Sequence, residues 1–197
     1  MTTPPSELRL PPLPFAQWDE RTRRALLAHL RRPALYLSDG PDAQPMPLVM
    51  ELFAQHVPVG ESFMTFTDTF VSDDSTLEPR LRELLILRVA WRTGSGYEWN
   101  QHHRMGGDEG LSPAQLAAVS EGPADPVWTA DERALLAAVD EVIDGFEVTD
   151  QTWAVLAESF SPAQLFELLF VVGGYLALAA VLNSIGLRGA ITAGKGD

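Results

Sequence analysis

Glu83 is the first side chain in this sequence that is placed to do acid–base chemistry. A helix through the surrounding residues puts Ile86, Leu87 and Ala90 on the same face as Glu83. A carboxylate on an apolar face loses hydration, so its pKa tends to rise toward neutrality, as a general acid or base requires. A buried ion pair with an arginine from another helix explains the same position equally well.

A second group of reactive side chains follows Gly94. Glu98 and His102 are four residues apart, so they lie one above the other on a helix face. Ser95 stands just before that helix, where free backbone N–H groups can receive an anion. Such a serine, glutamate and histidine can shuttle protons or hold a carboxylate. The alternative is an exposed Glu–His pair that stabilises the helix by only a few tenths of a kcal/mol.

Three further residues are predicted to contact a substrate. Tyr97 and Trp99 flank Glu98 and can form an aromatic wall, although such side chains more often fill a core. Arg88 is basic and close in sequence, so it can bind an anionic group; pairing with one of the many acidic residues is the alternative.

A metal site is a weaker interpretation of the same region. Glu98, His102 and His103 can be combined with Glu83 into a set of potential ligands. Adjacent histidines point about 100° apart on a helix, so both do not readily reach one ion. We therefore predict that no metal is bound here.

The chain is predicted to be all-α. Apolar residues recur at helical spacing, and no stretch alternates convincingly between apolar and polar residues as a strand does. Proline, glycine and capping patterns delimit the helices, including a capping box at Ser161 and Gln164. The predicted helices cover residues 15–29, 47–56, 61–70, 79–92, 97–108, a short stretch after 113, 129–143, 149–159 and a long last segment from 162.

One helical domain is expected over residues 15–187. Residues 1–14 contain five prolines and are expected to form an extended arm, and residues 188–197 a flexible tail. The last helix is apolar all round, so we expect another copy of the chain to cover part of the surface in a homo-oligomer.

Composition excludes several classes of function. The 14 Lys+Arg against 27 Asp+Glu give a net charge of -13, which argues against binding nucleic acid or an anionic membrane. The chain has no cysteine, which excludes disulfides, Cys-ligated metals and thiol chemistry. Its single lysine, Lys195, lies near the end, which argues against a Schiff-base mechanism.

No targeting segment is predicted. The proline-rich start lacks the apolar stretch of a signal peptide. The longest apolar run, residues 168–182, is shorter than the roughly 20 residues that span a bilayer, so it is interpreted as a buried core helix. A cytoplasmic protein is expected.

The stretch from residue 81 through Gly94 to His102 resembles the carboxymuconolactone decarboxylase family, which includes the alkyl hydroperoxide reductase D-like (AhpD-like) proteins. The resemblance covers roughly residues 50–187 and implies an all-helical bundle that assembles as trimers or hexamers. In the peroxidase branch a Glu, a Cys-x-x-Cys pair and a His form a proton relay. Glu83 and His102 match the relay, whereas Ser95 and Glu98 stand where the thiols would be.

A thiol peroxidase is excluded because serine cannot follow the oxidation chemistry of cysteine. The decarboxylase branch also lacks the thiol pair, and its members act on a small lactone acid without a cofactor. The resemblance thus implies a cofactor-independent lyase or isomerase for a small organic acid, lactone or enolisable carbonyl. His102 is its predicted acid or base, Glu83 its orienting group, and Glu98 a second acid–base residue. A non-catalytic ligand-binding or assembly protein with the same fold is the alternative.

Overall fold

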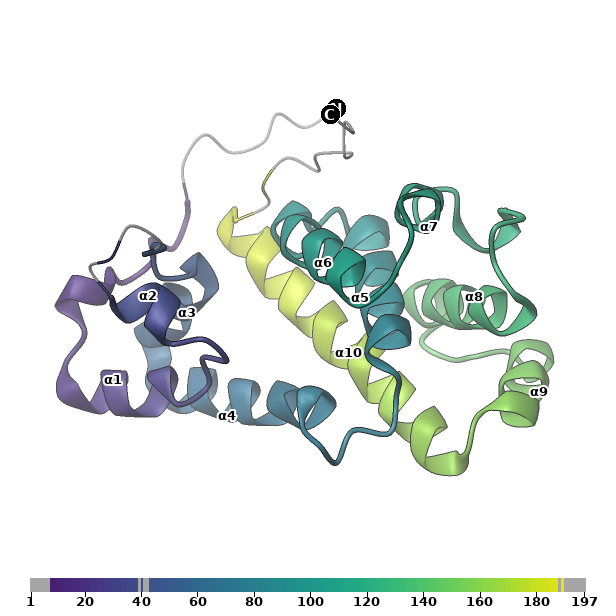
Figure 1. The fold of residues 1–197 in the computed structure, drawn as a ribbon, viewed down its shortest axis with the longest axis horizontal. Helices are drawn as coiled ribbons and strands as arrows, with labels where there is room; N and C mark the ends of the chain where they lie inside the picture. The colour runs from purple at the N-terminus through teal and green to yellow at the C-terminus, as the bar shows by residue number, and fades with distance from the viewer. Residues whose placement is uncertain (1–7, 39, 41–42, 188, 190–197) are drawn as a thin grey trace. The chain divides into compact units, whose positions relative to one another are not determined.

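The computed structural model describes residues 8–38, 40, 43–187 and 189 (Figure 1). Over these residues the chain consists of α-helices and short 3-10 helices without a strand, which confirms the predicted all-α class. The contacts group the described residues into two compact units, an N-terminal unit of residues 8–72 and a C-terminal unit from residue 73 onward. Compact units can share one folding domain, so the predicted single domain over 15–187 stays a prediction.

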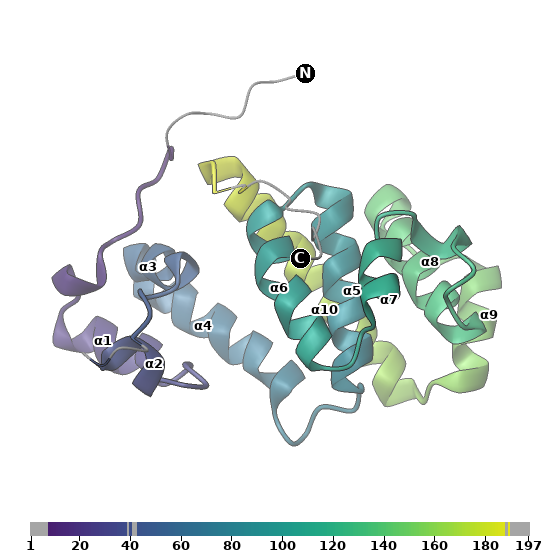
Figure 2. The ribbon, with the colours of Figure 1, turned by 45° about the horizontal axis from the view of Figure 1, so that its top comes forward.

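The N-terminal unit is built from four short helices and three 3-10 turns, drawn in purple to blue in Figure 2. Helix α1 begins after Asp19, whose side chain accepts a hydrogen bond from the Thr22 backbone N–H at 2.7 Å. Its core contains Trp18, Leu26 and Met50. The elements are η1 (Phe15–Gln17), α1 (Glu20–Leu27), α2 (Ala34–Leu37), α3 (Leu48–Phe53), η2 (Ala54–His56), α4 (Val57–Asp68) and η3 (Thr69–Val71).

This unit departs from the prediction in its details. The helix expected over 15–29 is a 3-10 turn followed by the shorter α1, and α2 was not predicted. The break expected at Pro58 and Gly60 is absent because α4 begins at Val57 and places the proline in its first turn. Gly60 lies inside the helix, and a larger residue would not fit there, because a Cβ would stand 2.6 Å from the Cβ of Phe53.

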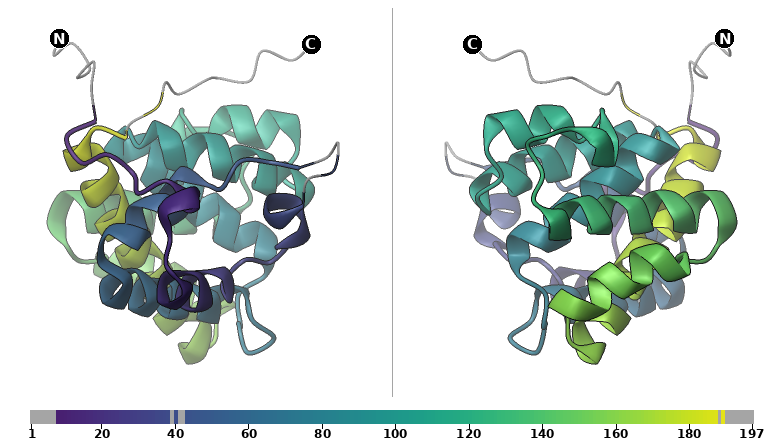
Figure 3. Two further views of the ribbon diagram at one scale, coloured as in Figure 1. Left: turned by 90° about the vertical axis from the view of Figure 1, so that its left-hand side faces the viewer. Right: turned by 90° about the vertical axis from the view of Figure 1, so that its right-hand side faces the viewer.

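The C-terminal unit surrounds one central helix. Helix α5 (Pro79–Thr93) packs against α6 (Gly96–Asp108), α8 (Ala130–Gly145) and α10 (Pro162–Ile185). Residues 82–90 of α5 are consequently all buried. The remaining elements are α7 (Pro113–Ala118), η4 (Gly122–Ala124) and α9 (Asp150–Ser159), and Figure 3 shows α9 beside α8 in green.

The helix boundaries of this unit are close to those predicted because local signals set them. The αL conformation of Gly94, at φ 65°, ends α5 where a glycine was expected to break it. Capping boxes open α7, α8 and α10 at Ser112, Thr129 and Ser161. The predicted capping box of the last helix is therefore confirmed.

Helix α10 buries one face and exposes the other. Its large exposed side chains include Phe166, Phe170 and Val181, whereas Leu168, Val171 and Leu182 are buried. Among the described helices, α10 alone is long and apolar enough to cross a membrane. The core helices of soluble proteins can have the same length and composition. The predicted cytoplasmic location and the predicted cover by another copy both stay predictions.

The structure describes only part of the two ends of the chain. Residues 8–14 of the predicted arm are described and lead into η1. Apart from Gly189, the predicted tail lies outside the described residues.

Candidate active site

The turn between α5 and α6 brings the two halves of the predicted site together. Gly94 lets the chain reverse, and the Ser95 backbone N–H donates to the Ala90 carbonyl at 2.9 Å. Helix α6 then packs against α5, so that a residue in the first turns of α5 can meet one on α6. This arrangement explains how Glu83 and His102 become neighbours despite their separation in sequence.

Glu83 and His102 form a hydrogen-bonded pair. The Glu83 Oε2 atom lies 2.7 Å from Nδ1 of His102, and the glutamate is 1% exposed. An Nδ1–H that donates to this carboxylate orients the ring and leaves Nε2 as the nitrogen that can exchange a proton with a substrate. The predicted meeting of these two residues is thus present, in the geometry that an acid–base pair requires.

Arg82 also stands beside the Glu83 carboxylate. Its Nε lies 3.5 Å from Glu83 Oε1, and both side chains are buried. The expected alternative for Glu83 was an arginine from another helix. The structure instead supplies the preceding residue of the same helix, and a histidine as the second partner. This positive charge offsets the cost of burying the glutamate.

Glu98 lies inside the protein rather than on an exposed helix face. It is 2% exposed, and neither of its carboxylate oxygens has a hydrogen-bond partner of normal geometry among the described residues. Burial raises the pKa of Glu98 from its usual value near 4.5 to about 7, while the nearby Ser95 hydroxyl and His102 ring lower it by less. A carboxyl with this pKa can give or take a proton near neutral pH.

Ser95 is completely buried at the N-cap of α6. Its Oγ makes no hydrogen bond with normal geometry to any described residue, and its side chain does not cap the helix. Ser95, Glu98 and His102 follow each other at intervals of three and four residues, so they share one side of α6. The structure thus places the predicted serine, glutamate and histidine on the same face.

Tyr175 is a neighbour of His102 that no pattern in the sequence predicts. Its ring stands edge-on to the imidazole, with 5.1 Å between ring centroids and 89° between planes. The tyrosine comes from α10, and no local pattern links it to α6. Only the packing of α10 against α5 reveals it.

The two aromatic residues beside Glu98 differ in their surroundings. Trp99 is 3% exposed and packs in the core with Leu84, Leu87 and Leu111, and its predicted contact with a substrate stays a prediction. Its ring also contacts His103, which therefore points away from His102. Tyr97 is half-buried and stays a predicted contact.

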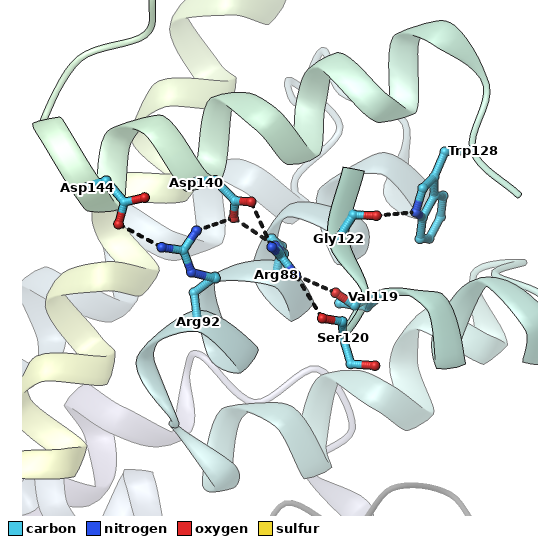
Figure 4. A network of polar contacts seen from close by, with 8 residues as sticks. All are labelled: Arg88, Arg92, Val119, Ser120, Gly122, Trp128, Asp140 and Asp144. Atoms are coloured by element: carbon cyan, nitrogen blue, oxygen red, sulfur yellow. Dashed lines mark hydrogen bonds and ion pairs between the residues drawn. The ribbon is translucent and has the colours of Figure 1, made fainter. Parts of the chain in front are cut away.

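Arg88 lies in a separate structural network, drawn in Figure 4. Its Nε and Nη2 donate to the two carboxylate oxygens of Asp140, both at 2.7 Å, and its Nη1 donates to the Val119 carbonyl at 2.7 Å. Gly122 leaves room for the guanidinium, because a Cβ there would stand 2.6 Å from Nη2. This placement differs from the predicted binding of an anionic substrate and matches the alternative of structural pairing.

Arg92 extends the same network. It pairs with Asp140 and Asp144, each at 2.7 Å, so α5 and α8 are joined by two arginines and two aspartates (Figure 4).

As for a metal centre, the described residues contain no group of three or more potential ligands arranged to hold an ion.

The resemblance to a known family is confirmed by comparison with other proteins. Residues 58–141 match the carboxymuconolactone decarboxylase family, a segment that contains α5, α6 and most of α8. No protein of curated function matches the chain.

Two solved structures share the fold. The AhpD core of an uncharacterised peroxidase-related protein from Ralstonia eutropha JMP134 matches with a TM-score of 0.76 and 17% identity, over 92% of each chain. A protein of unknown function from Agrobacterium tumefaciens, described as a candidate antioxidant defence protein AhpD, matches with a TM-score of 0.63 and 23% identity, over 68% of this chain and 92% of that one. These similarities confirm the AhpD-like helical fold.

Proposed function

We propose that this protein is an acid–base enzyme that needs no thiol, because residues 58–141 match the carboxymuconolactone decarboxylase family and contain a histidine that is paired with a buried glutamate. The proposed reaction is of the lyase or isomerase type on a small lactone or other enolisable carbonyl compound. The chain contains no cysteine, so the peroxidase descriptions of its structural neighbours do not transfer to it.

The contact between Glu83 and His102 carries this proposal. A histidine whose Nδ1 is held by a carboxylate presents Nε2 in one orientation, which is the arrangement of a general base. In the proposed step, Nε2 takes a proton from the carbon next to the substrate carbonyl. Glu83 stabilises the resulting imidazolium and acts as a positioning residue.

Glu98 supplies the complementary proton. Its protonated carboxyl gives a proton to the carbonyl oxygen while His102 removes one from carbon, so the product of this half-reaction is a neutral enol. When His102 returns its proton to a different carbon of a conjugated enol, the enol O–H returns its proton to Glu98, so the carbonyl re-forms, the isomerisation is complete and both residues are restored. Two titratable groups in unlike environments are what such a transfer requires.

Solvent exchange tests the proposal with a set of candidate carbonyl compounds. A panel of small ketones and lactones is incubated with the protein in deuterated water, and loss of the proton next to the carbonyl is followed by NMR. We expect exchange of at least one compound by the parent and a reduction of about 10²–10⁴-fold in His102→Ala.

His103→Ala is the matched control because His103 adjoins His102 but packs on Trp99. His103→Ala is expected to catalyse proton exchange at the same rate as the parent. Exchange that persists in His102→Ala would contradict the assigned base. A parent that exchanges none of the compounds would favour the alternative of a non-catalytic ligand-binding protein.

A further inference from the structure

The helix start at Ser95 differs from three similar ones in the same unit. Four helices of the C-terminal unit, α6, α7, α8 and α10, have Ser or Thr at the N-cap and Glu or Gln three residues later. Three of these pairs form a complete capping box. The fourth, Ser95 with Glu98, forms neither of the two bonds. We name it the open capping box.

The backbone explains why this box stays open. The Ser95 N–H is already bonded to the Ala90 carbonyl at the end of α5, so it cannot donate to Glu98. The ψ angle of Ser95 is 82°, whereas Ser112, Thr129 and Ser161 have 157°, 171° and 161°. The tight turn between α5 and α6 therefore imposes a conformation in which the usual cap does not close.

The open capping box leaves polar atoms inside the protein that make no hydrogen bond of normal geometry, although the Ser95 hydroxyl is close enough to Glu98 to lower its pKa. The Ser95 hydroxyl and both Glu98 oxygens are buried, and none has a hydrogen bond of normal geometry to another described residue. Such groups reduce stability when nothing pairs with them. They lie on the face of α6 that carries His102, where a bound molecule can supply the missing partners.

The charges around this subsite disfavour a carboxylate ligand. Glu98 and Glu83 contribute two carboxyl groups, and the Arg82 guanidinium is beside Glu83. Of the other arginines that the C-terminal unit shows, Arg88 and Arg92 are bound to aspartates, and the rest lie against Glu132, Asp108 or backbone carbonyls. A ligand carboxylate at the open capping box would thus face Glu98, and the two cationic groups nearby, Arg82 and a protonated His102, are already paired with Glu83.

We propose that the open capping box binds an uncharged oxygen of the substrate, and that the substrate is a neutral ketone, aldehyde or lactone rather than a carboxylic acid. Ser95 donates to the carbonyl oxygen, and Glu98 meets the same oxygen through its acidic hydrogen. This inference rests on the proposed function and narrows its substrate class.

A pair of probes that differ mainly in charge tests the inference. Phenol is neutral at pH 6 and benzoate is ionised, Glu98 retains its proton at that pH, and both probes carry one aromatic ring and a terminal oxygen group. Each is titrated into the full chain while the imidazole signals of isotope-labelled His102 are followed by NMR. We expect phenol to bind at least about tenfold more tightly than benzoate.

Two variants connect this preference to the open capping box. At pH 8 Glu98 of the parent is ionised, so Glu98→Gln, which cannot ionise, is expected to raise the affinity for benzoate several-fold at that pH. Ser95→Ala is expected to weaken phenol binding. Ser112→Ala, which alters a closed box of the same kind, should leave both affinities unchanged.

The inference is overturned if benzoate binds more tightly than phenol at His102, or if neither probe shifts the His102 signals. These titrations follow binding alone, so they fail separately from the exchange assay. Phenol binding without any proton exchange would contradict the proposed function while supporting the subsite. Exchange confined to carboxylate substrates would support the function and overturn the substrate class.

Discussion

The imidazole of His102 contacts two groups, the Glu83 carboxylate at Nδ1 and the ring of Tyr175, whose centroid lies 5.1 Å from that of the imidazole with 89° between the planes. The two contacts come from different helices, α5 and α10, so the orientation of the ring depends on both. The hydrogen bond selects the nitrogen that faces the carboxylate, and the aromatic contact restricts rotation of the ring.

Loss of the Tyr175 ring is expected to misplace the base. In Tyr175→Leu we predict exchange slowed by on the order of tenfold or more, because small displacements of a catalytic group cost rate steeply. Tyr175→Phe retains the ring contact and should recover most of the rate. Equal loss of rate in both variants would show that the hydroxyl, not the ring contact, is what matters.

Ser95→Ala and Ser112→Ala are expected to differ in stability. Ser112 Oγ accepts from the Gln115 backbone at 3.2 Å, so its removal should lower the free energy of unfolding by about 1 kcal/mol. Ser95 caps nothing, so Ser95→Ala should be neutral or stabilising. Denaturant midpoints of the two variants measure this directly, and an equal loss in both would mean that Ser95 also caps its helix.

Glu98 gives the stability of the protein a specific dependence on pH. Burial raises its pKa to about 7, so between about pH 4.5 and 7 the folded chain retains a proton that the unfolded chain releases. The contribution of Glu98 to the free energy of unfolding is therefore fully present below about pH 4.5. It is lost as the pH rises to about 7, by about 3 kcal/mol in total. Glu98→Gln should remove that decline in a series of denaturant curves.

Glu132 is the matched control, since it occupies the same position in a closed box. Burial raises its pKa, but hydrogen bonds from Thr129 and Arg80 outweigh that effect and leave the pKa lowered. Its contribution is present above the unfolded pKa and is lost as pH falls. Glu132→Gln should thus remove a slope of the opposite sign, and slopes of the same sign in both variants would contradict the assignment.

Arg88 is predicted to act on stability rather than on binding. Arg88→Ala leaves Asp140 with less compensation and removes a bond to the Val119 carbonyl, so we expect a loss of about 3–5 kcal/mol. Arg104→Ala removes an exposed pair with Asp108 and should cost less than about 1 kcal/mol. Urea unfolding compares the two variants. Unchanged stability in Arg88→Ala would restore Arg88 as a candidate for binding.

The amino-acid sequence by itself determined most helix boundaries of the C-terminal unit. Those boundaries depend on neighbouring residues, such as the glycine that ends α5 and the Ser–Gln pair that opens α10. Spacing also identified Glu83, Glu98 and His102, because helix periodicity places side chains at three and four residues on one face. Gly60 does not break its helix as its residue type predicts, because its place in α4 depends on the close approach of Phe53, which a local pattern does not contain.

The tertiary structure decided what these residues contact. By its residue type Arg88 can bind an anionic substrate or form structural ion pairs. Only the packing of α8 against α5 brings Asp140 within reach of Arg88. Tyr175 reaches His102 through the packing of α10, and the turn after Gly94 decides that the Ser95 box stays open while three similar boxes close. Local patterns record periodicity along one helix, whereas burial, pairing and pKa arise from helices that meet across the fold.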